Sequence, residues 1–136
     1  MNFFADANIS TRAVKLLEIF DAANSIVHHD ARFQRGTADI AWMSELARDN
    51  PKPVVLCGDG RILTNEAEKR ALREADLSFV VFKSAWMRLE WEQLAWKLLK
   101  TWPSIVKSVS TVKRPSIFEV TINEKVELIR ATADHR

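Results

Sequence analysis

The chain has 136 residues, of which 47% are apolar and 28% charged, the balance of one globular domain that builds its core without disulfides. Its formal net charge of +2 neither supports nor excludes a nucleic-acid partner, so any such partner must bind a local basic patch. No apolar run reaches the roughly 18 residues of a membrane span, the first residues lack the basic start of a signal peptide, and the single cysteine, Cys57, fits a reducing compartment. We therefore expect a single domain over residues 1–136, located in the cytoplasm.

The start of the chain predicts a strand, a helix and a second strand. Residues 2–5 form a short apolar run that ends at Asp6, which is typical of a strand. Ser10 is placed to cap a helix over about residues 11–22, in which one apolar face would hold Val14, Leu17 and Phe20. Residues 25–29 predict the second strand.

The alternation continues through the middle of the chain. Thr37 is placed to cap a helix over residues 38–48, and the continuous apolar run over residues 53–57 is typical of a buried parallel strand. A helix over residues 66–75 and a strand over residues 77–82 follow. This order predicts a three-layer α/β/α sandwich with a mostly parallel central sheet, in which sites form beyond the carboxyl ends of the strands.

The C-terminal third is rich in tryptophan. Ser84 is placed to cap a helix over residues 85–100, with one apolar stripe at helical spacing formed by Met87, Trp91, Leu94, Leu98 and Trp102. Trp86 and Trp96 fall off this stripe and suggest contact with a second copy of the chain or with another protein. Residues 118–122 alternate in polarity and predict a half-exposed strand.

This third is also locally basic, with cations at Lys97, Lys100, Lys107, Lys113 and Arg114. A solvated helix face is the usual explanation of such residues. The alternative is a surface that guides RNA, with tryptophan rings available for base stacking.

Three carboxylates stand at positions where an α/β sheet places its sites. Asp6 follows the first predicted strand and Asp59 follows the strand over residues 53–57. If both strands are central and parallel, these carboxylates converge at one edge of the sheet, and Asp39, in the first turn of the preceding helix, could lie over the same edge. Close carboxylates repel one another, and a bound Mg²⁺ or Mn²⁺ relieves that repulsion. Such an ion activates water and stabilises charge on a phosphodiester.

Each acid also has an ordinary explanation. Asp is a common turn residue after a strand, Asp59-Gly60 is a favoured turn pair, and Asp39 is favoured near a helix N-terminus by the helix dipole. Glu45 is a reserve site candidate on the same predicted helix, although six residues of helix turn it away from the face of Asp39. Arg61 is placed to meet a phosphate, with a surface salt bridge as the alternative.

Two further patterns suggest other chemistry. His28 and His29 would point to opposite faces of a strand, so they are not expected to bind one metal together. Lys83 after the fourth apolar run, together with Asp6 and Asp59, is similar to the arrangement of a phospho-acceptor receiver domain. That fold requires an acidic pair after its first strand, whereas this chain has Asp6-Ala7-Asn8.

The motifs taken together resemble the PIN and PIN-like domain family. Residues 2–9, Asn-Phe-Phe-Ala-Asp-Ala-Asn-Ile, resemble the opening Asp-x-Asn motif of these domains. Residues 36–42, Gly-Thr-Ala-Asp-Ile-Ala-Trp, are similar to the Gly-Thr-x-Asp-x-x-Trp stretch of a compact PIN-like subgroup. Residues 56–62, Leu-Cys-Gly-Asp-Gly-Arg-Ile, resemble that subgroup's strand-end segment, and residues 65–68 and 86–103 are also similar to it. The resemblance runs from about residue 2 to about residue 120 and rests on the order and spacing of the motifs.

The resemblance implies a Mg²⁺- or Mn²⁺-dependent endoribonuclease, often the toxin of a VapBC-type toxin–antitoxin pair. Asp6, Asp39 and Asp59 would be the catalytic, metal-binding acids, and Asn8 would orient the first of them. The partners that the resemblance implies are RNA and a small antitoxin protein, while a homodimer is suggested by the position of Trp86 and Trp96 off the apolar stripe.

The sequence departs from the family pattern beside Asp59. Typical members carry a fourth acid near the site, but Gly60 follows Asp59 here, so Glu66 or Glu68 would have to serve. Cys57-Gly58 stands where the family usually has Thr or Ser before the last Asp. These departures motivate an alternative, a PIN-like binding protein with weak or no catalysis that acts through its aromatic C-terminal region.

Overall fold

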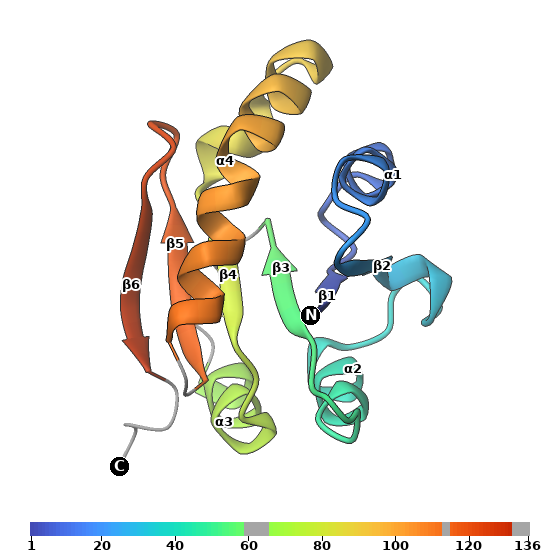
Figure 1. Ribbon diagram of the computed structural model, residues 1–136. Coiled ribbons are helices and arrows are strands. Elements are labelled where there is room, and N and C mark those ends of the chain that lie inside the picture. Colours follow the sequence, from blue (N-terminus) through green and yellow to red (C-terminus); the bar gives the residue numbers. More distant parts are fainter. Residues whose placement is uncertain (59–65, 113–114, 132–136) are drawn as a thin grey trace.

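A six-stranded sheet with helices on both faces organises the computed structural model, which describes residues 1–58, 66–112 and 115–131 (Figure 1). The first five strands in spatial order run parallel, and the last runs antiparallel to its neighbour. This arrangement confirms the predicted three-layer α/β class with a mostly parallel sheet. In spatial order the strands are β2 (Ser25–His28), β1 (Asn2–Ala5), β3 (Val54–Cys57), β4 (Phe79–Phe82), β5 (Ser116–Val120) and β6 (Val126–Ala131).

Each face of the sheet is covered by a pair of helices in the described part of the chain. One face carries α1 (Thr11–Phe20) and α4 (Trp91–Thr111), and the other carries α2 (Asp39–Leu46) and α3 (Glu66–Ala75). Each pair of helices encloses its own apolar core against the sheet. The core therefore consists of two layers that share only the strands.

Strand β1 shows how one strand supplies both cores. Phe3 enters the core beneath α1 and α4, where its ring lies 4.8 Å from that of Trp102. Phe4 points to the opposite face, where its ring lies 5.4 Å from that of Trp42 on α2. This is the alternation expected of a strand buried on both faces. It also fixes the face to which the next residues point.

Helix α1 begins as predicted but ends earlier. The Ser10 hydroxyl oxygen accepts hydrogen bonds from the backbone N–H groups of Arg12 and Ala13, at 3.1 and 3.4 Å. The helix ends at Phe20 rather than at residue 22. The expectation that Phe20 packs in the core is wrong: its side chain borders a hollow beside Trp102 and is 50% exposed.

The predicted cap of α2 is also wrong. The helix begins at Asp39 with Ala38 at the N-cap, and no side chain caps it. The Thr37 hydroxyl instead donates to the Gln34 carbonyl at 2.6 Å, so it is occupied in the turn before the helix. Asp39 in the first turn supplies the negative charge that the helix dipole favours.

The single helix predicted over residues 85–100 is two elements. A short 3₁₀ helix, η3 (Ser84–Arg88), follows β4, and α4 then begins at Trp91 and continues through Pro103. Trp86 explains the break, because its side chain is fully buried and its Nε1 donates to the Thr121 carbonyl at 2.9 Å. The suggestion that Trp86 forms an external contact is therefore wrong. Met87, which was predicted to begin the apolar stripe, lies in η3 rather than in α4 and is 41% exposed.

The C-terminal strands extend the sheet further than predicted. In place of the expected strand over residues 118–122, β5 covers Ser116–Val120 and is mostly buried between β4 and β6. Strand β6 was not expected. It pairs antiparallel with β5 at the edge of the sheet, where Leu128 and Ile129 are exposed.

No helix among the described residues combines the length and the apolar character needed to span a bilayer.

One hydrogen bond joins the end of α1 to the middle of α4. Trp102 Nε1 donates to Asp21 Oδ2 at 2.8 Å, and Asn24 Nδ2 donates to the same oxygen at 2.7 Å. The hydrogen bonds from Asn24 and then from Trp102 lower the pKa of Asp21 below its ordinary value. Because the folded state favours the charged form, this contribution to stability is present above the unfolded pKa of about 4 and is lost as the pH falls through the folded pKa.

We expect Asp21→Asn to lower the free energy of unfolding at pH 7 by about 1 kcal/mol, since Asp21 is partly solvated and a charged hydrogen bond there is weaker than a buried one. The difference from the parent chain should shrink below about pH 4. Urea unfolding across pH 3–7 measures it, with Glu18→Gln, an exposed acid of α1, as the control. A difference that stays constant with pH would contradict the assigned bond.

Candidate functional site

Asp6 lies where the chain leaves the carboxyl end of β1. Its backbone N–H donates to the Leu56 carbonyl at 2.9 Å, which continues the pairing of β1 with β3 by one residue. Its side chain is 8% exposed, and Oδ1 accepts a hydrogen bond from the Asn8 backbone N–H at 3.0 Å. The sheet and a tight turn therefore fix the position of this carboxylate, and Asn8 contributes through its backbone.

The strand order places Asp6 where the order of the strands reverses, between β1 and β3. In the order β2-β1-β3-β4-β5, the chain moves outward from β1 to β2 and then returns to β3 on the other side of β1. Sheets of this order bind ligands beyond the carboxyl ends of the strands at the reversal, which here lies between β1 and β3. Asp6 follows β1 at this point. Gly58, the residue before Asp59, follows β3 at the same point.

The side-chain alternation turns Asp6 toward the face covered by α2. Phe4 points to that face and Ala5 to the other, so Asp6 returns to the face of Phe4. The register pairs Ala5 with Leu56, which sets Asp6 opposite Cys57, a buried residue of the same core. Asp6 therefore lies at the edge of the core that α2 and α3 cover.

Asp39 belongs to the same layer. It is the first residue of α2, and its Oδ1 accepts a hydrogen bond from Nε1 of Trp42 at 3.0 Å. Trp42 is almost fully buried against Phe4 of β1. The indole therefore ties Asp39 to the strand that ends in Asp6. The Asp-x-x-Trp spacing is the sequence signal that would have found this contact, since residues three apart are neighbours on a helix.

The third predicted acid, Asp59, lies outside the described residues, as do Gly60 and Arg61. Within the described residues, no group of three His, Cys, Asp or Glu side chains is arranged to hold a metal ion. The structure thus places Asp6 and Asp39 on one face of the sheet. Asp59 is the second residue after the end of β3 in the sequence. The joint geometry of the three acids stays a prediction.

The reserve acids are placed differently. Glu45 Oε1 pairs at 3.2 Å with Nη1 of Arg48, just beyond the end of α2, and Glu66 Oε1 pairs at 3.5 Å with Nζ of Lys69 within α3. Such pairs between residues three apart are typical of solvated helix faces. The side chain of Glu68 lies outside what the structure describes.

His28 has a positional role that the sequence did not reveal. Its Nδ1 accepts the Asp30 backbone N–H at 3.0 Å, so the ring proton is on Nε2, which donates to the Ile9 carbonyl at 2.7 Å. The ring therefore holds the turn after Asp6 against the end of β2. His29 points to the opposite face, as predicted, and packs against Phe4.

Asp30 and Lys83 are engaged in ion pairs. Asp30 contacts His29 and Arg35, and these hydrogen bonds, that of His29 first, lower its pKa. Lys83 Nζ lies 3.5 Å from Glu119 Oε2, which places it in a cross-strand pair at the ends of β4 and β5. The receiver-like interpretation gains no support from this pairing.

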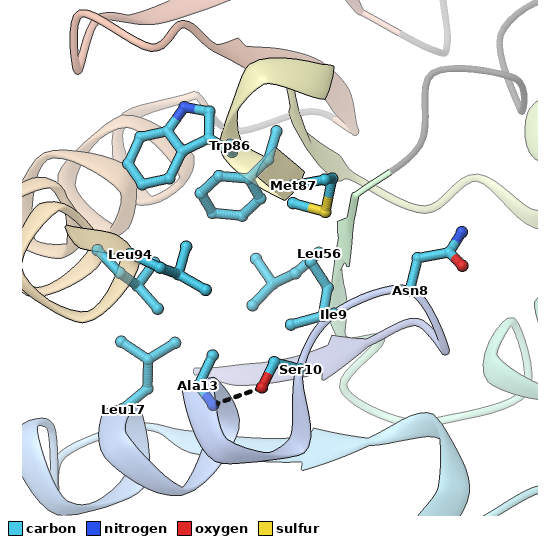
Figure 2. Close-up of a pocket in the computed structure, with 11 residues that line it drawn as sticks. Asn8, Ile9, Ser10, Ala13, Leu17, Leu56, Trp86, Met87 and Leu94 are labelled. Carbon is cyan, nitrogen blue, oxygen red and sulfur yellow. Dashed lines mark hydrogen bonds between the residues drawn. The ribbon is translucent and has the colours of Figure 1, made fainter. Parts of the chain in front are cut away.

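An apolar pocket of about 130 Å³ lies on the other face of the same sheet edge (Figure 2). It is enclosed by α1, α4, η3 and the carboxyl ends of β3 and β4, and its polar lining residues, Asn8 and Ser10, come from the turn that follows Asp6. A pocket with so few polar partners favours apolar contents over water. Its lining residues are Asn8, Ile9, Ser10, Ala13, Leu17, Leu56, Phe82, Trp86, Met87, Leu94 and Leu98.

Met87 links this pocket to the end of β3. A Cβ added at Gly58 would lie 2.6 Å from Met87 Sδ and 3.4 Å from Ile9 Cδ1. The thioether therefore packs directly on the glycine that precedes Asp59. The end of the Met87 side chain would have to shift if residue 58 carried a Cβ.

Comparison with known proteins identifies a family. A family model described as "PIN like domain" matches residues 1–84, which is more than half of the chain. Searches of the curated proteins and of the solved structures found no match.

We expect Gly58→Ala to lower the free energy of unfolding by about 1 kcal/mol, because the new methyl group overlaps Met87 Sδ. In a Met87→Ala background the same substitution should have almost no effect, since the overlapping atoms are gone. Chemical unfolding of the four chains measures this coupling as a double-mutant cycle. Additive effects of the two substitutions would show that Met87 does not pack on Gly58.

Proposed function

The chain belongs to the PIN-like domain family, and from this membership we propose that it is a divalent-metal-dependent endoribonuclease. PIN-like domains are generally nucleases, so hydrolysis of phosphodiester bonds is the coarse activity that the family implies. The observation that carries the proposal is the fixed Asp6 carboxylate at the reversal between β1 and β3, on the face where Trp42 holds Asp39. Asp59 follows β3 at the same reversal.

In this proposal Asp6, Asp39 and Asp59 hold a Mg²⁺ or Mn²⁺ ion. Carboxylate oxygens are the donors that both ions prefer, and PIN nucleases generally use divalent metals. The bound ion would supply an activated water and stabilise charge on the phosphodiester. The backbone N–H of Asn8 keeps Asp6 oriented, and Trp42 Nε1 does the same for Asp39. These outer contacts restrict the carboxylates before any ligand arrives.

The neighbouring residues have supporting roles. Arg61, two positions after Asp59, would pair with a phosphate of the substrate. Glu66 and Glu68 open the next helix and would supply the acid that is missing at Gly60. Glu45 is the less favoured reserve because six residues of helix turn it away from the face of Asp39.

We further propose that the chain is the toxin of a VapBC-type toxin–antitoxin pair, with a small antitoxin protein as its partner. The similarity of its motifs to the compact PIN-like subgroup supports this. A small DNA-binding protein encoded beside it, and growth arrest that the Asp6→Ala form does not cause, are the results expected. An antitoxin groove or a homodimer contact at Trp86 is excluded by the burial of that side chain.

The alternative is a PIN-like binding protein with little catalysis, which Gly60 in place of an acid motivates. Its suggested surface, the aromatic C-terminal region, is smaller than expected, because Trp86 and Trp102 are buried and Trp91 is half-buried. Turnover of RNA in Mn²⁺ that is lost on chelation would rule against this alternative.

We expect Asp6→Asn, Asp39→Asn and Asp59→Asn each to reduce RNA cleavage by more than about 100-fold, since loss of a direct ligand exceeds the effect of an outer contact. Chelation with EDTA should abolish cleavage by the parent chain, and added Mn²⁺ should restore it. The measurement is cleavage of a labelled RNA by highly purified protein, with Glu18→Gln as the charge-matched control. Unchanged cleavage by Asp6→Asn and Asp59→Asn would refute the proposal.

We expect Trp42→Phe to weaken Mn²⁺ binding about tenfold, because a smaller aromatic ring stays in the core while the hydrogen bond to Asp39 is lost. The matched control is Trp86→Phe, which removes another buried indole N–H, bonded to Thr121 rather than to an acid. Calorimetric titration with Mn²⁺ separates the two variants even if both are less stable. Equal Mn²⁺ affinity in both would show that Trp42 does not position a metal ligand.

A further inference from the structure

Trp96 is the most exposed aromatic side chain among the described residues. It lies on α4 and is 61% exposed, whereas Trp42, Trp86 and Trp102 of the same chain are buried. Its neighbours three and four residues away on the helix are Glu92, Gln93, Leu99 and Lys100. A protein interface normally surrounds such an anchor with further apolar surface. The ring of Trp96 stands instead among mostly polar residues.

Two ammonium groups lie beside this ring. Lys100 Nζ is 4.9 Å and Lys97 Nζ 5.9 Å from its centroid. Glu124, in the turn between β5 and β6, pairs with both amines at 2.9 Å. The hydrogen bonds from Lys100 and Lys97 lower the pKa of Glu124, so its carboxylate stays charged and holds both amines in place at neutral pH. Two lysines and one glutamate leave the cluster with one net positive charge.

The cluster lies at the same edge of the sheet as Asp6. Strands β1 and β5 run in the same direction, so the turn that follows β5 and carries Glu124 lies at the carboxyl edge. Figure 1 shows this turn and the first half of α4 at the end of the sheet where the arrow of β3 points. From β1 to β5 there are three strand spacings of about 4.8 Å, or roughly 14 Å, which a few nucleotides of extended RNA span.

We propose that Trp96, Lys97 and Lys100 form a subsite for single-stranded RNA that flanks the bond to be cleaved. One base stacks on the exposed face of Trp96, and a neighbouring phosphate pairs with Lys100, the more exposed of the two lysines. The indole ring and the two ammonium groups are complementary to a nucleotide, whose base stacks on an aromatic ring and whose phosphate binds a cation. The choice of RNA as the ligand rests on the proposed nuclease function. Binding of RNA at this subsite does not itself require that the chain cleaves RNA.

The test measures the affinity of the full chain for a fluorescent 12-nucleotide RNA by anisotropy, in the Asp6→Asn background to prevent cleavage. Trp96→Ala should weaken binding about tenfold, and Trp96→Phe should retain most of it because a stacking ring remains. Lys100→Ala should weaken binding and reduce its salt dependence. The matched controls are Phe20→Ala, an exposed aromatic on α1, and Lys107→Ala, an exposed lysine further along α4; neither should change the affinity.

RNA length provides a second criterion. Because the end of β5 is displaced from the end of β1 by roughly 14 Å across the sheet, Trp96→Ala should leave the binding of a dinucleotide unchanged and weaken only the binding of longer RNA. Equal affinity of Trp96→Ala and its parent for the 12-mer overturns the proposal, and so does an absence of RNA binding by either chain. Self-association that is lost in Trp96→Ala while RNA affinity is unchanged would assign the ring to a homodimer contact and also overturns it.

The outcomes separate this proposal from the proposed nuclease activity. If the parent chain binds the 12-mer through Trp96 but does not cleave it in Mn²⁺, the subsite stands and the nuclease fails. If the parent chain cleaves RNA and Trp96→Ala cleaves and binds the 12-mer equally well, the nuclease stands and the subsite fails.

Discussion

The parallel pairing of β1 with β3 is the constraint on which the rest of the structure depends. The register of Ala5 with Leu56, continued by the hydrogen bond from the Asp6 N–H to the Leu56 carbonyl, brings the ends of two buried strands together. Because both strands run in one direction, the segments that follow them leave at one edge. The same register turns Asp6 toward α2 while Leu56 lines the apolar pocket on the opposite face. The pairing of β1 with β3 thus places a carboxylate on one face of the carboxyl edge of the sheet and an apolar pocket on the other face.

A small number of contacts on each face holds the ends of β1 and β3 in place. On the α2 face, Trp42 joins Asp39 to Phe4 of β1, so the position of an acid depends on the packing of the core. On the α1 and α4 face, Met87 packs on Gly58 at the end of β3. His28 bonds the turn after Asp6 to the end of β2. The candidate site is therefore held by the core packing of both layers rather than by its own polar contacts alone.

Local sequence was sufficient for the strands that lead to the site and for the start of α1, because β1 and β3 are short, mostly apolar runs and Ser10 is a local cap, whereas the predicted cap of α2 was wrong. Prediction from local sequence failed where a contact between residues far apart in the chain determines the structure. Trp86 breaks the expected helix through its bond to Thr121, 35 residues away, and no local pattern encodes that contact. Strand β6 is stabilised by pairing with β5, and although Val126 packs against the core, Leu128 and Ile129 are exposed, so the apolar residues do not alternate to mark one buried face. For the site, Asp6 followed from strand order, whereas Asp39 depended on the family motif until Trp42 explained its position.

The central claim is that Asp6 and Asp39 belong to one metal centre at the reversal between β1 and β3. Nuclear magnetic resonance of the full chain with substoichiometric Mn²⁺ tests it most directly, because the ion broadens only the signals of nearby nuclei. The account predicts strong broadening of the Asn8 amide and the Trp42 indole N–H, with the Trp102 indole N–H, bonded to Asp21, unaffected. Broadening that spares Asn8 and Trp42, or that is centred on another acid such as Asp21, would contradict it.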